Sequence, residues 1–119
     1  MENTISINYF QKAGVGLKAR IREFYGEILG WKLEEVSPRL DIFTFAEAST
    51  YGVQYTDDHH SVLSDEGYRK STWLSIRSER RDELVESIKR FGVEELLEQS
   101  DESNYFFQAP GGQVYVVGK

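Results

Sequence analysis

Residues 41–55 read DIFTFAEASTYGVQY, and residues 103–117 read SNYFFQAPGGQVYVV. Apolar side chains alternate with other residues in both stretches, which is typical of β-strands with one buried face. Laid 62 positions apart, the stretches agree in residue class, with Phe43 opposite Tyr105, Phe45 opposite Phe107, Val53 opposite Tyr115 and Tyr55 opposite Val117. The second half of the chain is therefore predicted to repeat the first.

A helical pattern precedes each of these stretches. Apolar side chains recur at the i, i+3/i+4, i+7 spacing of one buried helix face, at Leu17, Ile21, Phe24, Tyr25 and Ile28 in the first half and at Leu84, Ile88 and Phe91 in the second. Each half is thus predicted to run strand, helix, strand, strand, strand. A unit that cannot bury its own apolar face must stack on its twin, and the seam between the two is a natural place for a pocket.

The expected elements follow from these patterns and from the turn residues between them. Strands are predicted at 5–11, 31–36, 41–47, 51–56, 71–76, 93–98, 104–108 and 113–117, and helices at 17–29 and 80–91. Residues 13–16 are predicted to form a turn because they contain two glycines, Gly30 to end the first helix, and Ser78 to cap the second. The prediction is one α+β domain over residues 1–119, with modules at approximately 4–57 and 69–119.

The composition limits the partners. The 119 residues carry a net charge of −6 with a pI near 4.9, which disfavours nucleic acid and anionic membranes and makes a cationic or neutral ligand easier to accommodate. The chain has no cysteine, so it has neither a disulfide framework nor a thiol nucleophile, as expected in a reducing cytoplasm. No apolar run approaches the length of a membrane span. We expect a cytoplasmic protein.

Two motifs resemble a known superfamily. Residues 24–31, FYGEILGW, resemble the FY…LG(F/W) signature that ends the first helix in the vicinal oxygen chelate superfamily, which contains glyoxalases, bleomycin-resistance proteins and extradiol dioxygenases. Residues 105–113, YFFQAPGGQ, look like its last hairpin, usually written F-x-D-P-D-G-N. Element order and duplication also agree, so the resemblance covers the whole chain. It implies a glyoxalase-like fold, in which two tandem βαβββ modules form a concave mixed sheet with a cavity.

In the catalytic members of that superfamily a divalent metal sits in the cavity, held by His, Glu or Gln from the first, fourth, fifth and eighth strands. The resemblance places the eighth-strand position at Val116, six residues after Pro110, and the fourth-strand position at Gln54, through the 62-residue repeat. The fifth-strand position falls at Ser71 and the first-strand position near Asn8. None of the four is His, Asp or Glu, and neutral amides and hydroxyls bind transition metals poorly. We therefore expect neither a metal nor another cofactor.

Two aromatic side chains extend this candidate site. Trp73 shares a strand face with Ser71, since side chains alternate with period two, and Phe10 is its partner in the other module. The two rings form either an aromatic clamp for a planar or cationic ligand or part of the core. The amides of Asn8 and Gln54 either orient a ligand or satisfy neighbouring backbone and water. The predicted ligand-binding residues are Asn8, Phe10, Gln54, Ser71, Trp73 and Val116.

Residues 57–60, DDHH, are another source of polar side chains. Adjacent residues in a loop seldom converge on one metal ion, and a polar linker needs no chemistry. If this loop folds over the mouth of the cavity, His59 or His60 would be the proton carrier, since His titrates near neutrality. The catalytic residues of the chain are otherwise unknown.

Three functions are compatible with these residues. We favour a metal-independent small-molecule-binding protein of the bleomycin-resistance type, which sequesters a cationic or aromatic compound. The alternatives are a metal-dependent lyase or dioxygenase of the same superfamily, and a non-catalytic regulatory or assembly module with a vestigial cavity. We expect a homodimer, because short sheets leave edges to protect and the resemblance implies that modules of two chains can complete a cavity.

Overall fold

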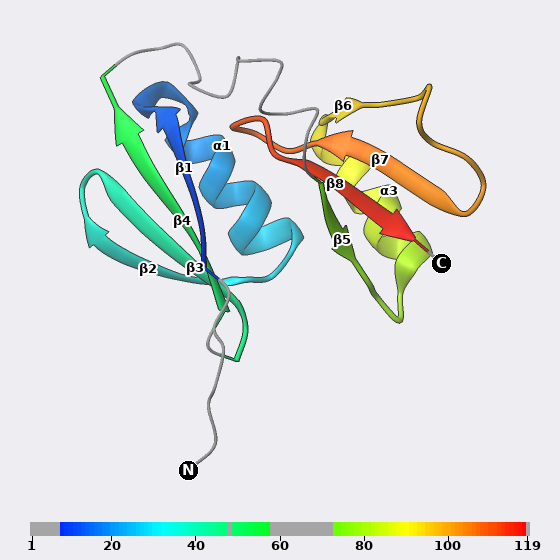
Figure 1. Cartoon of the computed structure of the whole chain (residues 1–119), viewed down its shortest axis with the longest axis horizontal. Coiled ribbons are helices and arrows are strands. Elements are labelled where there is room, and N and C mark those ends of the chain that lie inside the picture. The colour runs from blue at the N-terminus through cyan, green and yellow to red at the C-terminus, as the bar shows by residue number, and fades with distance from the viewer. Residues whose placement is uncertain (1–7, 48, 58–72, 119) are drawn as a thin grey trace.

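The structure, a computed structural model, describes residues 8–47, 49–57 and 73–118. Each half of the chain forms its own sheet and helix, and the halves lie side by side (Figure 1). The first module contains β1 (Asn8–Gly14), η1 (Val15–Leu17), α1 (Lys18–Arg22), η2 (Glu23–Ile28), β2 (Lys32–Ser37), β3 (Leu40–Ala46) and β4 (Ser49–Thr56). The second contains β5 (Leu74–Ile76), α3 (Arg81–Phe91), β6 (Glu94–Glu95), β7 (Asn104–Gln108) and β8 (Val114–Gly118).

Both sheets are mixed and have the same connectivity. The strand orders are β1-β4-β3-β2 and β5-β8-β7-β6, with the first strand of each module parallel to its last and the other neighbours antiparallel. A parallel pair needs a long crossover connection, which the helix and the two intervening strands supply. The predicted α+β fold of two tandem βαβββ modules is confirmed, and the two sheets do not close into a barrel within the described ranges.

The strand pairing corrects the spacing of the repeat. Gln54 on β4 pairs with Leu40, whereas Val116 on β8 pairs with Phe106. A shift of 62 residues from β4 to β8 would therefore require a shift of 66 from β3 to β7. A common shift of 64 satisfies both pairings and makes Gly52, not Gln54, the equivalent of Val116. It also superposes buried core residues on each other, namely Phe43 on Phe107, Tyr51 on Tyr115 and Val53 on Val117.

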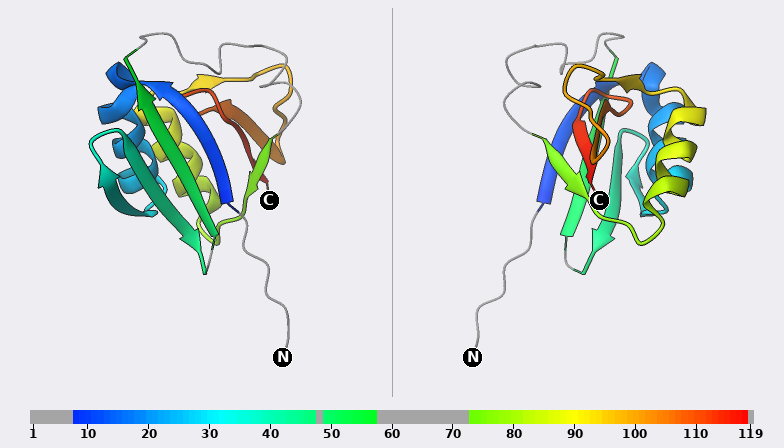
Figure 2. Two further views of the ribbon diagram at one scale, coloured as in Figure 1. Left: turned by 60° about the vertical axis from the view of Figure 1, so that its left-hand side comes forward. Right: turned by 90° about the vertical axis from the view of Figure 1, so that its right-hand side faces the viewer.

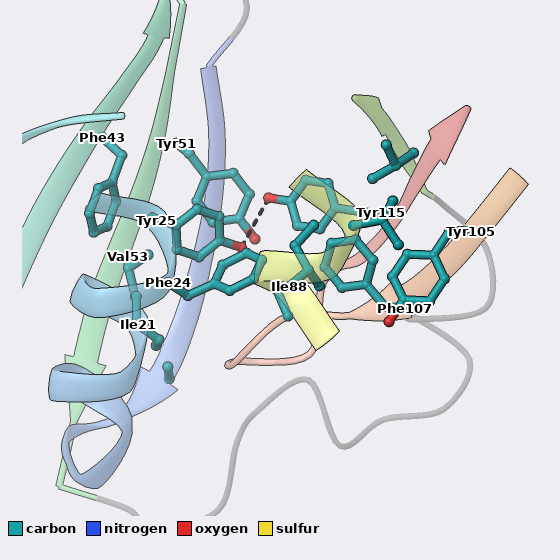
Figure 3. Close-up of a cluster of buried hydrophobic side chains, with 14 of the residues drawn as sticks. Ile21, Phe24, Tyr25, Phe43, Tyr51, Val53, Ile88, Tyr105, Phe107 and Tyr115 are labelled. Carbon is teal, nitrogen blue, oxygen red and sulfur yellow. Dashed lines mark hydrogen bonds between the residues drawn. The ribbon is translucent and has the colours of Figure 1, made fainter. Parts of the chain in front are cut away.

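One apolar core joins the two modules. The two helices lie on the same side of the molecule, with β1 and β5 on the opposite side (Figure 2). The ring of Phe24 lies 5.4 Å from that of Phe91 and 5.8 Å from that of Phe107, between centroids. The hydroxyl of Tyr115 donates a 2.9 Å hydrogen bond to the hydroxyl of Tyr25 (Figure 3). Edge-on ring pairs contribute about 0.5–1.5 kcal/mol each beyond the area they bury, so the modules are held together by the core itself.

The helices end near the predicted residues. Gly30 follows the first helical segment with φ 72°, and Gly92 ends α3 with φ 95°, a left-handed conformation that glycine adopts without strain. The predicted cap at Ser78 is wrong, because α3 begins after Arg80. The Ser78 hydroxyl instead accepts a 3.1 Å hydrogen bond from the Arg80 N–H just before the helix. No helix in the described ranges is long and apolar enough to cross a membrane.

Two strands differ in extent from the prediction. β1 continues through residues 13–14, where the glycines predict a turn, because Gly14 keeps an extended backbone with φ −64° and ψ 143° and pairs with Thr56. β6 is far shorter than the predicted 93–98. The chain turns at Leu96, whose carbonyl accepts a hydrogen bond from the Ser100 hydroxyl. Residues 5–7 and 71–72 of the predicted first and fifth strands lie outside the described residues.

Candidate functional site

The candidate site is the face of each sheet that points away from the helices, here called the open face. On the opposite face, Gln11 and Ala13 of β1 and Tyr51, Val53 and Tyr55 of β4 are buried. Because side chains alternate along a strand and paired residues point the same way, the intervening residues lie on the open face. In the first module these are Asn8, Phe10 and Lys12 of β1, Leu40, Ile42 and Thr44 of β3, and Thr50, Gly52, Gln54 and Thr56 of β4.

Phe10 lies beside a glycine on this face. It pairs with Gly52 on β4, which pairs in turn with Ile42 on β3. A Cβ atom at Gly52 would lie 3.1 Å from Cδ1 of Ile42 and 3.5 Å from Cδ1 of Phe10, so both neighbouring side chains approach the space above the glycine. Phe10 nevertheless remains 53% exposed. A ring that is anchored on one side and open on the other offers a stacking surface to a ligand.

The second module carries a comparable patch. Val116 pairs with Ser75 on one side and with Phe106 on the other. The ring of Trp73, just before β5, lies 6.1 Å from that of Phe106 between centroids, with the two planes inclined by 77°. Val116 is only 7% exposed, whereas Trp73 is 58% exposed. Val116 therefore forms the floor of this open face, and Trp73 is its most accessible ring.

The structure places four described members of the predicted site on the open faces, namely Asn8, Phe10, Gln54 and Val116. The ring of the fifth, Trp73, lies beside that of Phe106, the partner of Val116 on the second open face. Ser71, His59 and His60 lie outside the described residues. More than half of Phe10 and of Trp73 is exposed, so neither ring is a filler of the core. Sequence reasoning missed Gly52, Ile42 and Phe106, because strand register rather than spacing brings them next to the two rings. That any of these residues binds a ligand stays a prediction.

The two predicted amides are in different situations. Thr50 donates a 2.5 Å hydrogen bond from Oγ1 to Oδ1 of Asn8, and the two residues are paired in the register. The side chain of Gln54 forms no hydrogen bond to another residue within the described ranges. An amide offers two donor hydrogens and an acceptor oxygen. Gln54 is therefore better placed than Asn8 to accept a ligand.

The described part of the open faces does not fit a metal ion. The eighth-strand position is the hydrocarbon side chain of Val116, and its equivalent on β4, Gly52, has no side chain. Gln54 offers a neutral amide. Nowhere in the described ranges do three or more His, Cys, Asp or Glu side chains come together as a metal-binding group. Divalent transition metals need imidazole, carboxylate or thiolate ligands, so these residues do not suit the metal of the enzymes that the sequence resembles.

A cluster of ionisable groups is buried on the helix side of the first sheet. Arg22 donates two 2.7 Å hydrogen bonds, from Nε and Nη2, to the carboxylate of Asp41, and the Tyr55 hydroxyl donates a third at 2.8 Å. Burial alone raises the pKa of Asp41, but the hydrogen bonds from Arg22 and Tyr55 outweigh it and the net pKa is lowered. Burial and the neighbouring carboxylate raise the pKa of Tyr55. Since Asp41 is fully buried and its oxygens are occupied, we interpret this cluster as structural.

A pocket of about 260 Å³ lies between the start of α1 and the β7–β8 hairpin, lined by Leu17, Arg20 and residues 92–94 and 108–112. The guanidinium of Arg20 donates to the carbonyls of Phe91 and Gly92 at 3.5 and 3.4 Å and lies 4.1 Å from the centre of the Phe91 ring. It thereby neutralises the partial negative charge at the end of α3. None of the predicted ligand-binding residues lines this pocket.

Comparisons with known proteins agree with this fold. No family model matches the chain, and no curated protein matches its sequence. Among solved structures, it resembles the trypanothione-dependent glyoxalase I of Leishmania major, with 20% identity over 98% of this chain and 87% of that chain and a TM-score of 0.74. It also resembles the fosfomycin resistance protein FosX of Listeria monocytogenes, with 17% identity over 99% and 90% of the two chains and a TM-score of 0.65.

A third similar structure is the bleomycin-binding protein of Streptomyces verticillus in complex with copper(II)-bleomycin. It has 15% identity over 99% of this chain and 98% of that chain, with a TM-score of 0.59. All three have the fold of the vicinal oxygen chelate superfamily. The glyoxalase-like fold expected from residues 24–31 and 105–113 is thus confirmed. At this level of identity the likeness concerns the fold alone.

Proposed function

We propose that the protein binds a small aromatic molecule on its open faces without the help of a metal ion. The proposal is carried by the rings of Phe10, on β1, and Trp73, just before β5, each of which is more than half exposed. Each ring has an apolar companion, Ile42 or Phe106, so a patch rather than a lone side chain faces outward, as is typical of binding surfaces. Stacking on such a ring contributes about 0.5–1.5 kcal/mol.

The structural neighbours support a binding role. The Streptomyces verticillus protein of the same fold was solved with copper(II)-bleomycin, so this arrangement of modules can hold a small molecule. The metal-independent part of the proposal is supported by the donor set of the described open faces, where Val116 and Gly52 offer no ligand atom from a side chain.

Trp73 is a built-in reporter for the test. The chain has two tryptophans, and the other, Trp31, packs against Tyr25 with ring centroids 5.1 Å apart. A Trp31→Phe variant therefore leaves the open face as the source of tryptophan fluorescence. A thermal-shift screen of aromatic compounds identifies a binder, since a ligand at 100 times its Kd adds about 2.7 kcal/mol to the free energy of unfolding. Binding is then measured through Trp73 emission.

We expect Phe10→Ala and Trp73→Ala each to weaken binding by about fivefold, the equivalent of one lost stacking contact. Affinity in these variants is measured by calorimetry, which does not depend on Trp73 emission. Leu97→Ala is the matched control, because Leu97 is 71% exposed but lies in the turn after β6. Equal effects of all three substitutions would contradict the proposed site. Silence across a chemically diverse screen would favour the regulatory or assembly module.

Metal analysis of the purified, dialysed protein tests the second half of the proposal. We expect no stoichiometric transition metal. Zinc, nickel, iron or manganese retained at one ion per chain would overturn metal independence and favour the metal-dependent lyase or dioxygenase. Sedimentation at several protein concentrations tests the homodimer that the sequence predicts.

A further inference from the structure

We propose that the ligand carries an anionic group, a carboxylate or phosphate, which Lys12 and Gln54 bind beside the ring of Phe10. This inference rests on the proposed function and names the chemical class of its ligand. It reverses the expectation of a cationic ligand that the net charge of −6 suggests.

The register brings the two polar side chains together. Lys12 on β1 is paired with Gln54 on β4, and Phe10 precedes Lys12 by two residues and is paired with Gly52. In a parallel pair, partners point to the same face, and residues two apart on a strand do so as well. An ammonium group, an amide and a half-exposed ring therefore lie next to one another on the open face of the first sheet.

Both polar groups are available to a ligand. Neither the ammonium of Lys12 nor the amide of Gln54 has a side-chain partner among the residues that the structure describes. Two other cations of the first module have carboxylate partners, since Arg22 is bound to Asp41 and Nζ of Lys18 lies 3.6 Å from Oε2 of Glu35. A lysine on the face of a sheet without a counter-ion nearby attracts an anion from solution.

The local charge differs from that of the whole chain. β1 reads NYFQKAG and β4 reads STYGVQYT, so neither strand contains an acidic residue. The acids lie on other elements. Glu34 shares the open face, but it is on β2, three strands and so about 14 Å from β1. Asp82, Glu83 and Glu86 are on α3. Because exposed charges more than about 10 Å apart are largely screened at 0.1 M salt, the field at Phe10 follows Lys12 rather than the net charge.

The expected preference is moderate, because Lys12 is exposed. Exposed ion pairs contribute at most a modest free energy, which corresponds to about a fivefold change in affinity. A hydrogen bond from the Gln54 amide to the same anion would strengthen the contact, since hydrogen bonds to charged groups are stronger than those to neutral ones.

Three matched probes test this inference: 2-naphthoate, the neutral 2-naphthamide and the cationic 2-naphthylmethylammonium. Their affinities for the full-length protein are measured by calorimetry, and the side-chain amide signal of Gln54 is followed by NMR. We expect naphthoate to bind about fivefold more tightly than naphthamide, the ammonium compound to bind most weakly, and the naphthoate advantage to shrink as salt is raised.

Lys12→Gln should lower the affinity for naphthoate by about fivefold and so abolish its preference over naphthamide. Lys32→Gln is the control, because it removes the same charge from β2, at the far edge of the same sheet. This variant should keep the preference for naphthoate. Equal affinities of the three probes for the wild-type protein, or a preference that survives Lys12→Gln, would overturn the inference while leaving the proposed function intact. If none of the three binds at millimolar concentration, the proposed aromatic site and this inference both fail.

Discussion

The two modules share one topology, but different interactions hold their helix-facing sides together. In the first, the buried carboxylate of Asp41 is bound by Arg22 and Tyr55. In the second, the shift of 64 residues places Tyr105 at the position of Asp41. The ring of Tyr105 stacks on that of Phe107 with centroids 5.6 Å apart. The βαβββ topology thus requires buried and outward-facing side chains to alternate along each strand. At the position shared by Asp41 and Tyr105 it accepts either a buried charge or a stacked ring.

The open faces of the two modules also differ in the side chains that they present. The first module has a glycine floor at Gly52 and an unpaired cation at Lys12 among the described residues. The second has a valine floor at Val116, beside the pair formed by Trp73 and Phe106. Under the proposed function both modules supply rings, and the first also supplies the polar contacts that orient the ligand.

The largest expected effect comes from removing the buried charge of the first module. Asp41→Asn keeps the shape of the side chain but leaves Arg22 without its buried counter-ion, a loss that typically costs about 3–5 kcal/mol. Because the Arg22 side chain is 32% exposed, we expect a decrease of about 3 kcal/mol in the free energy of unfolding, measured in urea at neutral pH. Glu35→Gln removes the exposed partner of Arg22 and should change stability much less. Equal losses would contradict the role of burial.

The same ion pair predicts how stability depends on pH. The pKa of Asp41 is lowered in the folded protein, so its contribution is complete above the ordinary Asp pKa of about 3.9 and is lost as the pH falls through the lower folded value. We expect the stability difference between wild type and Asp41→Asn to shrink in this acid range. Hydrogen bonding to Arg22 also lowers the pKa of Glu35, so the comparison is made in the Glu35→Gln background. A difference independent of pH would contradict the assignment.

A smaller effect is expected at the contact between the modules. Gly111 has φ 96°, and a Cβ atom there would lie 2.3 Å from Nε2 of Gln11 on β1. Gln11 cannot easily move away, because it is buried and Tyr51 donates a hydrogen bond to its Oε1. We expect Gly111→Ala to lower the free energy of unfolding by about 2 kcal/mol or more. The measurement is again urea unfolding.

Gly92→Ala provides the matched control for this substitution. Gly92 has almost the same φ, 95°, but nothing lies within 4 Å of a Cβ atom placed there. Its cost of about 1 kcal/mol should reflect the left-handed backbone alone. The excess cost at Gly111 should then fall when Gln11→Ala is added. If both glycines cost the same, the modules are not in tight contact at this hairpin.

The sequence predicts the topology because each module repeats clear periodic patterns. The strand at 104–108 has the predicted bounds, and Gly30 ends the first helix as expected. The spacing of the repeat could not be obtained in the same way. Side chains in strands alternate with period two, so shifts of 62 and 64 residues match the same faces. Only hydrogen-bonded pairing distinguishes the two shifts, and with them Gln54 from Gly52 as the equivalent of Val116.

For the candidate site, too, the sequence predicts which face a residue lies on but not its neighbours. The alternation of side chains along a strand predicts that Phe10 and Trp73 lie on the open faces, but it does not predict whether other parts of the chain cover those faces. The neighbours of these rings, Ile42 and Phe106, come from strands that are distant in sequence and depend on register. The buried partners of Asp41 are likewise a tertiary feature, since the spacing of a carboxylate and an arginine in the sequence does not determine whether water is excluded from them.

The smallest expected effect concerns the hydrogen bond between Tyr115 and Tyr25, which links the aromatic side of the second module to the first helix. Burial raises the pKa of both hydroxyls, so both remain protonated at neutral pH and can donate. Tyr115→Phe removes the donor and should cost about 1 kcal/mol of unfolding free energy. A double-mutant cycle with Tyr25→Phe should give a coupling of at least about 0.5 kcal/mol. Since both substitutions keep the rings, zero coupling would mean that ring packing alone joins the modules.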